Sequence, residues 1–266
     1  MRVGFIGLGS QGAPMARRIV EAGFETTLWA RRPGTLAPFE RTPARTAASP
    51  AALGAAADLV CLCVVDDGDV LGVAEQVLTG LRPGGCLVVH STVHPDTCRR
   101  LAERAAAQQV TVLDAPVSGG GRAAEQGTLL VMVGGEEKAY DSCRPVFETY
   151  GDPVVHLGPT GSGQLAKLLN NLLFTAQLGL AADTLALGDR LGLDRDGLGR
   201  ILPRGSSASF ALERVVDAGG TLDRIAAHAG GLLAKDVRLL TDVAGPDAPG
   251  AAARDAARAA LSAMGL

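Results

Sequence analysis

Short apolar runs alternate with longer alanine-rich amphipathic stretches over the first 157 residues, and this alternation restricts the fold more than any other feature of the chain. A helix-length segment separates most of the runs, as in parallel strands joined by crossover helices. Such a sheet is buried on both faces. The pattern predicts an α/β fold with a doubly wound, mainly parallel sheet. The expected strands are Val3–Ile6, Thr26–Ala30, Leu59–Val64, Cys86–His90, Thr111–Asp114, Leu129–Val133 and Val154–Leu157.

Strand patterns stop at about Gly161, and the remaining chain predicts helices separated by glycine and proline turns. The first of these helices is expected over residues 163–191. Leucines cover most of its circumference, so we expect it to be buried between domains or between subunits. The chain is therefore expected to consist of an α/β domain over residues 1–160 and an all-helical domain over residues 161–266.

Composition limits the partners of this chain. A formal net charge of −3, with no run of basic residues longer than two, predicts no nucleic-acid partner. The apolar runs are far shorter than the roughly 20 residues that span a bilayer, so no membrane partner is expected. The five cysteines, including Cys61 and Cys63, and the four histidines lack metal-ligand spacing, so no metal is expected. The chain opens on a strand rather than a leader-like segment, which favours a cytoplasmic protein.

The segment Gly7-Leu8-Gly9-Ser10-Gln11-Gly12 lies between the first expected strand and a helix. In this context the first glycine permits a tight turn, the second lets a pyrophosphate approach the backbone, and the third allows close helix packing. The phosphates then lie at the helix N-terminus. The pattern predicts a dinucleotide-binding loop made by these six residues.

The end of the second expected strand reads Trp29-Ala30-Arg31-Arg32 and has no carboxylate, where an NAD site usually has one for the ribose 2'-hydroxyl. Guanidinium groups bind a 2'-phosphate, so Arg31 and Arg32 favour NADP, with NAD still possible. The alternative is that both arginines are merely solvated.

Two further strand ends are expected at the same edge of the sheet. They carry Val64 and Val65 and, after the next strand, Thr92, and we assign all three to the cofactor site. Thr92 either contacts the nicotinamide or only caps the following helix.

Two later segments predict substrate chemistry. Ser118-Gly119-Gly120 follows the strand ending at Asp114, and its freed backbone amides are suited to a carboxylate, although a flexible surface loop has the same composition. Lys167 lies on the long helix with Asn170 and Asn171 one turn later. A partly desolvated lysine has a lowered pKa and can transfer a proton near neutrality, while amides orient the substrate. The alternative is that these groups pair with buried backbone.

Four blocks of the sequence together resemble the β-hydroxyacid dehydrogenase family, and they span most of the chain. The blocks are Gly4–Gly12 with Pro14, Asp114–Gly120 with Gly127-Thr128-Leu129, Gly161–Asn171, and the pair Lys235-Asp236. The resemblance implies a Rossmann domain followed by a helical domain, and a homodimer or homotetramer built around the long helix. It also implies an oxidoreductase that interconverts a small 3-hydroxy acid and its semialdehyde, for which Arg31 and Arg32 favour NADP as the cofactor.

The same resemblance assigns roles to residues. Lys167 is the general acid and base, and Asn171 orients the substrate and the lysine. Asn170 contacts the substrate, whose carboxylate is bound by Ser118, Gly119 and Gly120. Lys235 is implied at the substrate or cofactor. Gln11 replaces a usual methionine and His228 a frequent phenylalanine. His228 is therefore a candidate substrate contact, and the alternative is an ordinary surface or core histidine. The alternatives are an imine reductase, which generally lacks the lysine, and a non-catalytic NADP-binding protein.

Overall fold

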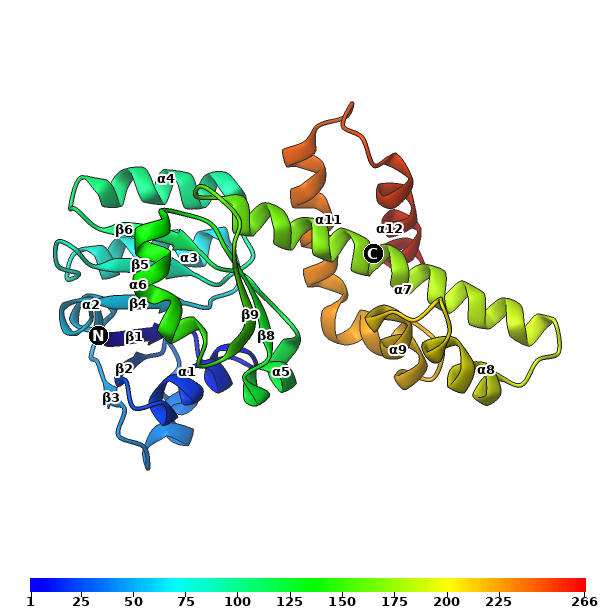
Figure 1. Ribbon diagram of the computed structural model, residues 1–266, viewed down its shortest axis with the longest axis horizontal. Coiled ribbons are helices and arrows are strands. Elements are labelled where there is room, and N and C mark those ends of the chain that lie inside the picture. The colour runs from blue at the N-terminus through cyan, green and yellow to red at the C-terminus, as the bar shows by residue number, and fades with distance from the viewer. The chain divides into compact units, whose positions relative to one another are not determined.

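The computed structural model describes residues 1–266 and divides them into two compact units, Met1–Lys167 and Leu168–Leu266. The long helix α7, Ser162–Arg190, begins in the first unit and continues into the second. Figure 1 shows both units, with most helices and strands labelled.

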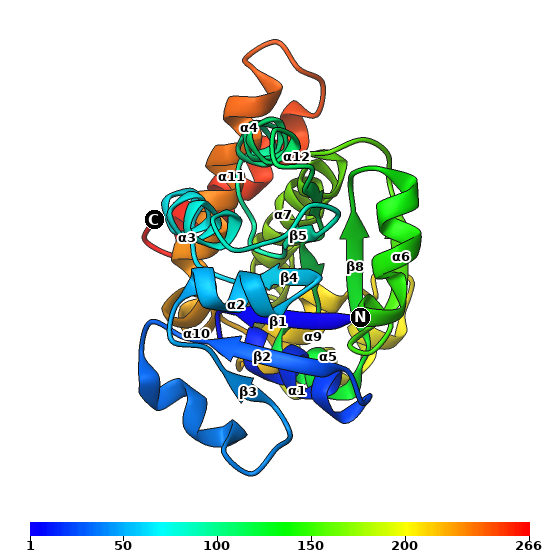
Figure 2. The same ribbon diagram turned by 90° about the vertical axis from the view of Figure 1, so that its left-hand side faces the viewer.

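The first unit contains a six-stranded sheet in the order β3-β2-β1-β4-β5-β6, and every pairing in it is parallel. This confirms the predicted doubly wound α/β fold. Figure 2 shows β3, β2, β1, β4 and β5 following one another across the sheet. The strands are β1 Arg2–Ile6, β2 Glu25–Trp29, β3 Arg45–Thr46, β4 Leu59–Leu62, β5 Cys86–Val89 and β6 Thr111–Asp114.

Helices cover both faces of this sheet, because successive side chains of each strand point to opposite faces. Phe5 of β1 packs with residues of α1 and α6, whereas Ile6 packs with residues of α2, α3 and α4. The helices are α1 Gly12–Glu21, α2 Pro50–Ala56, α3 Asp67–Leu78, α4 Pro95–Ala106 and α6 Glu137–Phe147, with the 3-10 helix η1 at Pro33–Phe39.

The last two predicted strands lie in a second sheet instead of extending the first. This sheet has the order β7-β8-β9, formed by Val117–Ser118, Leu129–Val133 and Gly151–His156. The pairing of β7 with β8 is antiparallel and that of β8 with β9 is parallel. Helix α5, Gly120–Gln126, connects β7 to β8. The strand β9 begins earlier than expected, and the two-residue strands β3 and β7 were not expected, because such short segments carry no alternation.

The second unit is helical throughout, as predicted. After α7 follow α8 Arg195–Ile201, the 3-10 helix η2 Leu202–Arg204, α9 Phe210–Asp217, α10 Asp223–Ile225, the π-helix η3 Ala226–Gly230, α11 Gly231–Ala244 and α12 Ala251–Ala263. Some leucines of α7, such as Leu168 and Leu185, belong to the core of this unit. No helix of the chain has both the length and the apolar character that crossing a membrane requires.

A second set of leucines on α7 lies on its exposed side. The leucine stripe, as we call Leu169, Leu173, Leu180, Leu187 and Leu191, runs along one face of the helix and just past its end, with each member more than half exposed. Within the second unit, one face of the helix is therefore buried and the other exposed, and burial between domains or subunits stays a prediction.

Candidate functional site

The loop between β1 and α1 is shaped by close backbone approaches. Gly7 has a φ of +101°, and a Cβ there would overlap the carbonyl oxygen of Cys63, just after β4. A Cβ at Gly12 would overlap the carbonyl oxygen of Gly7. At Gly9, by contrast, a Cβ would meet no atom within 4 Å. The loop is thus packed against the sheet at both ends and open at its centre.

The open centre of this loop fits a phosphate group. Helix α1 has no side chain capping its first amides and no acidic residue in its first turn, so its positive end is available to an anion. Ser10 is exposed and Gln11 is half-buried. Leu8 is a core residue, so only its backbone can serve a ligand. These residues fit the pyrophosphate of a dinucleotide.

Arg31 and Arg32 follow β2 at the same edge of the sheet, and both are exposed. The Nη1 atom of Arg31 lies 3.2 Å from Oδ1 of Asp69, in the first turn of α3. Arg32 makes no ion pair. Two guanidinium groups are therefore available where an adenosine ribose would lie, one of them shared with a carboxylate.

The loops after β4 and β5 are joined by a hydrogen bond from the backbone N–H of Val64 to the Ser91 hydroxyl, at 2.9 Å. Val65 is 60% exposed and Thr92 is half-buried. The N-cap of α4 is His94, whose ring accepts from the N–H of Asp96. The structure therefore contradicts the alternative that Thr92 is the capping residue.

The turn after β7 lies directly against the loop between β1 and α1. Ser118 ends the strand, and Gly119 and Gly120 follow in the left-handed region with φ of +127° and +75°. A Cβ at Gly121 would lie 2.8 Å from the carbonyl oxygen of Ser10. The predicted carboxylate turn and the predicted phosphate loop are thus neighbours in the first unit.

Helix α7 is anchored to the end of β6 through Asp114. This fully buried carboxylate accepts from the N–H of Gly161 at 2.6 Å and from the N–H of Gln164 at 2.8 Å. Burial raises the pKa of Asp114, and the backbone hydrogen bonds from Gly161 and Gln164 oppose that rise. A Cβ at Gly163 would overlap the carbonyl oxygen of Met132, so the helix starts in close contact with β8.

Gln164 adds a second anchor. Its fully buried side chain donates to the carbonyl oxygen of Ser91 at 2.9 Å and accepts from the N–H of Val93 at 3.1 Å. The two bonds fix the backbone on either side of Thr92. Lys167 lies three residues beyond Gln164 on the same helix. Sequence reasoning did not single out Gln164, Ser91 or the capping role of Asp114, although a glutamine so close to the start of an apolar helix is a usable signal.

Asn171 lies at the centre of a buried network in the second unit. Its Nδ2 donates to Oδ2 of Asp236 at 2.5 Å, and its Oδ1 accepts from Asn170 at 3.0 Å. The Nζ atom of Lys235 lies 3.1 Å from the other Asp236 oxygen, close enough for an ion pair but not aligned as a hydrogen bond. Asp236 thus links Asn171 with Lys235, and Asn170 joins this network through Asn171.

His228 stands apart from this network. It is exposed, belongs to the π-helix Ala226–Gly230, and its Nδ1 lies 2.7 Å from the carbonyl oxygen of Arg224. π-Helical turns often mark functional positions.

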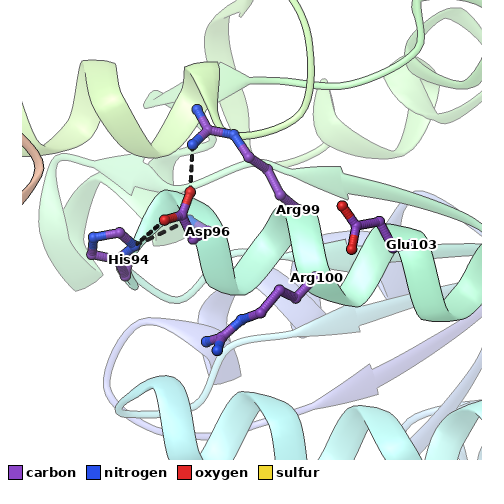
Figure 3. A pocket seen from close by; sticks show the side chains of 5 residues that line it. All are labelled: His94, Asp96, Arg99, Arg100 and Glu103. Carbon is purple, nitrogen blue, oxygen red and sulfur yellow. Dashed lines mark hydrogen bonds and ion pairs between the residues drawn. The ribbon is translucent and has the colours of Figure 1, made fainter.

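A surface cavity of about 450 Å³ lies along α4. Its lining residues are His94, Asp96, Arg99, Arg100 and Glu103 (Figure 3). Asp96 already pairs with Arg99, at 2.5 Å, and lies 3.7 Å from the ring of His94. Charges of both signs are thus partly matched within the cavity, and none of the predicted site residues lines it.

Comparison with known proteins agrees with both parts of this arrangement. The family model for the NAD binding domain of 6-phosphogluconate dehydrogenase matches residues 2–158. The model for the NAD-binding of NADP-dependent 3-hydroxyisobutyrate dehydrogenase matches residues 161–263. Together they span nearly the whole chain.

Individual proteins are also similar to this chain. A 3-hydroxyisobutyrate dehydrogenase of Pseudomonas aeruginosa is 35% identical over 221 residues, 79% of this chain and 72% of its own length. An NAD-dependent L-serine dehydrogenase of the same species is 33% identical over 253 residues, 91% of this chain and 85% of its own. The solved structure of Psf3 in complex with NADP+ and 2-OPP matches with a TM-score of 0.86 at 26% identity, covering 99% of this chain and 93% of that one. This chain therefore belongs to the β-hydroxyacid dehydrogenase family and is an NAD(P)-dependent hydroxyacid dehydrogenase.

Proposed function

We propose that this dehydrogenase prefers NADP(H) and interconverts a small 3-hydroxy acid and its semialdehyde, with Lys167 as the general acid and base. The observation that carries the proposal is the anchoring of α7. Asp114 and Gln164 fix its first turns to the strand ends beside the proposed cofactor loop, and Lys167 is the next polar residue along the helix.

The cofactor is proposed to lie along the carboxyl edge of the parallel sheet. The backbone of Gly7, Leu8, Gly9, Ser10, Gln11 and Gly12 would hold its pyrophosphate, and Val64, Val65 and Thr92 would line the path toward the nicotinamide. Arg31 and Arg32 would bind the 2'-phosphate. Support for NADP over NAD is the lack of a carboxylate at the end of β2, where a ribose 2'-hydroxyl would need an acceptor.

The substrate carboxylate is proposed to bind the Ser118 hydroxyl and the amides of Gly119 and Gly120. Lys167 would donate a proton to the carbonyl oxygen during reduction and remove it from the hydroxyl during oxidation. The bound nicotinamide would exchange a hydride with the carbinol carbon. Asn171 and Asn170 would orient the reacting groups, with further contacts assigned to Lys235 and His228.

Substitution of Lys167 tests the proton transfer. In Lys167→Ala the turnover number should fall about 10²- to 10⁴-fold, because no ammonium group remains to transfer the proton. The dissociation constant of NADPH, measured by calorimetry, should change by less than about twofold, since the lysine acts on the substrate. Lys138→Ala, at an exposed lysine of α6, is the matched control and should retain activity. Unchanged turnover in Lys167→Ala would refute the assignment.

A substrate screen tests the reaction class. Semialdehydes and hydroxy acids of two to six carbons should be turned over faster than cyclic imines, and NADPH should serve better than NADH. Arg31→Gln should weaken NADPH by about tenfold and NADH much less, because a guanidinium bound to a phosphate contributes a charge-assisted hydrogen bond. An equal loss for both cofactors would exclude the 2'-phosphate role.

We also propose that the protein is a homodimer or homotetramer and acts in the cytoplasm. Within each chain, we propose that the first domain ends at residue 160. The leucine stripe supports the assembly, because five largely exposed leucines along one face of a helix are suited to burial against another subunit. The five cysteines are free thiols, four of them buried, which suits a reducing compartment.

A further inference from the structure

Three acidic residues lie at the start of α3, and each has a different partner. Asp66 accepts from the N–H of Asp69 and caps the helix. Asp67 turns toward α4, where it accepts from the N–H of His94 and the hydroxyl of Thr97. Asp69 pairs with Arg31 at 3.2 Å. Only the Asp69 carboxylate thus meets the residues that follow β2.

The Arg31–Asp69 pair crosses the carboxyl end of β1. Strand β1 lies between β2 and β4 (Figure 2), so the ends of the outer two strands are about 10 Å apart, two strand spacings. Arg31 extends from the end of β2, and Asp69 from the helix that follows β4. The pair therefore spans the edge of the sheet above Gly7, where a dinucleotide of this fold binds.

We propose that Asp69 is a specificity-determining residue that weakens the preference for NADP(H). The inference rests on the proposed 2'-phosphate role of Arg31. Asp69 occupies one N–H group of that guanidinium and adds a negative charge beside it. A 2'-phosphate must share Arg31 with this carboxylate and is repelled by it, whereas the neutral 2'-hydroxyl of NAD(H) is not.

The exposures of the two side chains support an effect of Asp69. The Asp69 side chain is 26% exposed and that of Arg31 is 77% exposed, so the carboxylate is the less solvated partner and its charge is less screened. Arg32 makes no ion pair and can meet a phosphate without competition. Arg32 thus keeps its full attraction for the phosphate, so Asp69 should reduce the preference for NADP(H) without abolishing it.

Asp69→Asn tests the proposal, because it removes the charge and keeps the size of the side chain. Isothermal titration calorimetry on the full chain should show NADPH binding about two- to fivefold tighter, the range of a partly screened surface charge. NADH affinity should change by less than about twofold, and the gain for NADPH should shrink at high salt. The control is Glu25→Gln, which removes the same charge from the Arg45–Glu25 pair at the opposite end of β2 and should alter neither affinity.

The outcomes separate this inference from the proposed function. If Arg31→Gln weakens NADPH selectively but Asp69→Asn leaves NADPH unchanged or weaker, the inference fails and the NADP preference stands. Equal tightening of both cofactors, or the same gain in Glu25→Gln, also overturns it, because the effect is then general electrostatics. If Arg31→Gln affects both cofactors alike, the 2'-phosphate role fails and the inference fails with it.

Discussion

At the scale of single residues, His90 lies in the core although it directly follows a strand at the functional edge of the sheet. Its ring Nδ1 is 2.7 Å from the carbonyl oxygen of Ala115, and its Nε2 is 3.2 Å from the hydroxyl of Tyr150. Burial lowers the pKa of His90 to about 4. The ring is therefore neutral, donating to Ala115 and accepting from Tyr150.

This environment predicts a pH-dependent part of the stability. The unfolded chain takes up a proton at His90 near pH 6.5, and the folded chain only near pH 4. The contribution of the neutral His90 ring to the free energy of unfolding is therefore complete above pH 6.5 and is lost as the pH falls toward 4. The loss is on the order of 3 kcal/mol. Urea unfolding at pH 7 and pH 4.5 should show the wild type losing about 2–3 kcal/mol more than His90→Gln. Parallel losses in the two proteins would contradict this.

A second residue-scale prediction concerns Asp236, which accepts from Asn171 in the second unit. Asp236→Ala leaves the buried Nδ2 of Asn171 without an acceptor and should lower the free energy of unfolding by about 1–3 kcal/mol. Asp236→Asn keeps an acceptor oxygen and should lose less. Chemical denaturation of both variants gives the comparison, and equal losses would mean that the hydrogen bond is not the cause.

At the scale of elements, the first turns of α7 tie together loops from several strands. Asp114 bonds to Gly161 and Gln164, while Gln164 bonds to Ser91 and Val93. The position of Lys167 along the helix is therefore set by contacts that lie before it. In the proposed mechanism, the exact position of the Lys167 ammonium group relative to the substrate depends on this anchoring.

Gln164→Leu tests the anchoring. The carbonyl oxygen of Ser91 and the N–H of Val93 lose their partners, which should cost about 2–5 kcal/mol of stability in total. The turnover number should fall about tenfold or more, because a small shift of a catalytic group is costly. Gln76→Leu, at an exposed glutamine of α3, should change neither quantity. If turnover is retained in a destabilised Gln164→Leu, the anchor serves stability alone.

The elements themselves were largely predictable, whereas their pairing was less so. The long helix was expected over 163–191 and spans Ser162–Arg190, because its apolar pattern is local. The strand Val117–Ser118 was missed, and the second sheet with it, since a two-residue strand is defined only by the partner it meets. The loops of the candidate site were predicted from the sequence. The hydrogen bonds of Ser91 and Gln164 that hold these loops in place were not.

At the scale of the whole molecule, α7 presents two different faces. At about 100° per residue, Lys167 and Asn171 lie roughly opposite the leucine stripe. The stripe runs the length of the helix with spacings of four, seven, seven and four residues. The helix therefore separates a polar face with the proposed catalytic residues from an apolar face suited to a second copy of the chain.

The proposed assembly predicts the effect of charge on that face. Leu180→Glu combined with Leu187→Glu should convert the oligomer to a monomer, because burying carboxylates in an apolar interface is strongly unfavourable. Light scattering after gel filtration measures the mass. Ala186→Glu, at an exposed position on another face of α7, should leave the assembly intact. A monomeric wild type would remove the basis for this prediction.

The sequence by itself determined the α/β class, the helical second part, the glycine loop and the family, because these depend on periodicity and on motifs of neighbouring residues. Only the tertiary structure decided that Asp114 and Gln164 anchor α7, that His90 belongs to the core, and that Asp69 pairs with Arg31. The partners in these contacts are 38 to 73 positions apart. Contacts over such separations follow from how the strands order and pack, and no local pattern encodes them.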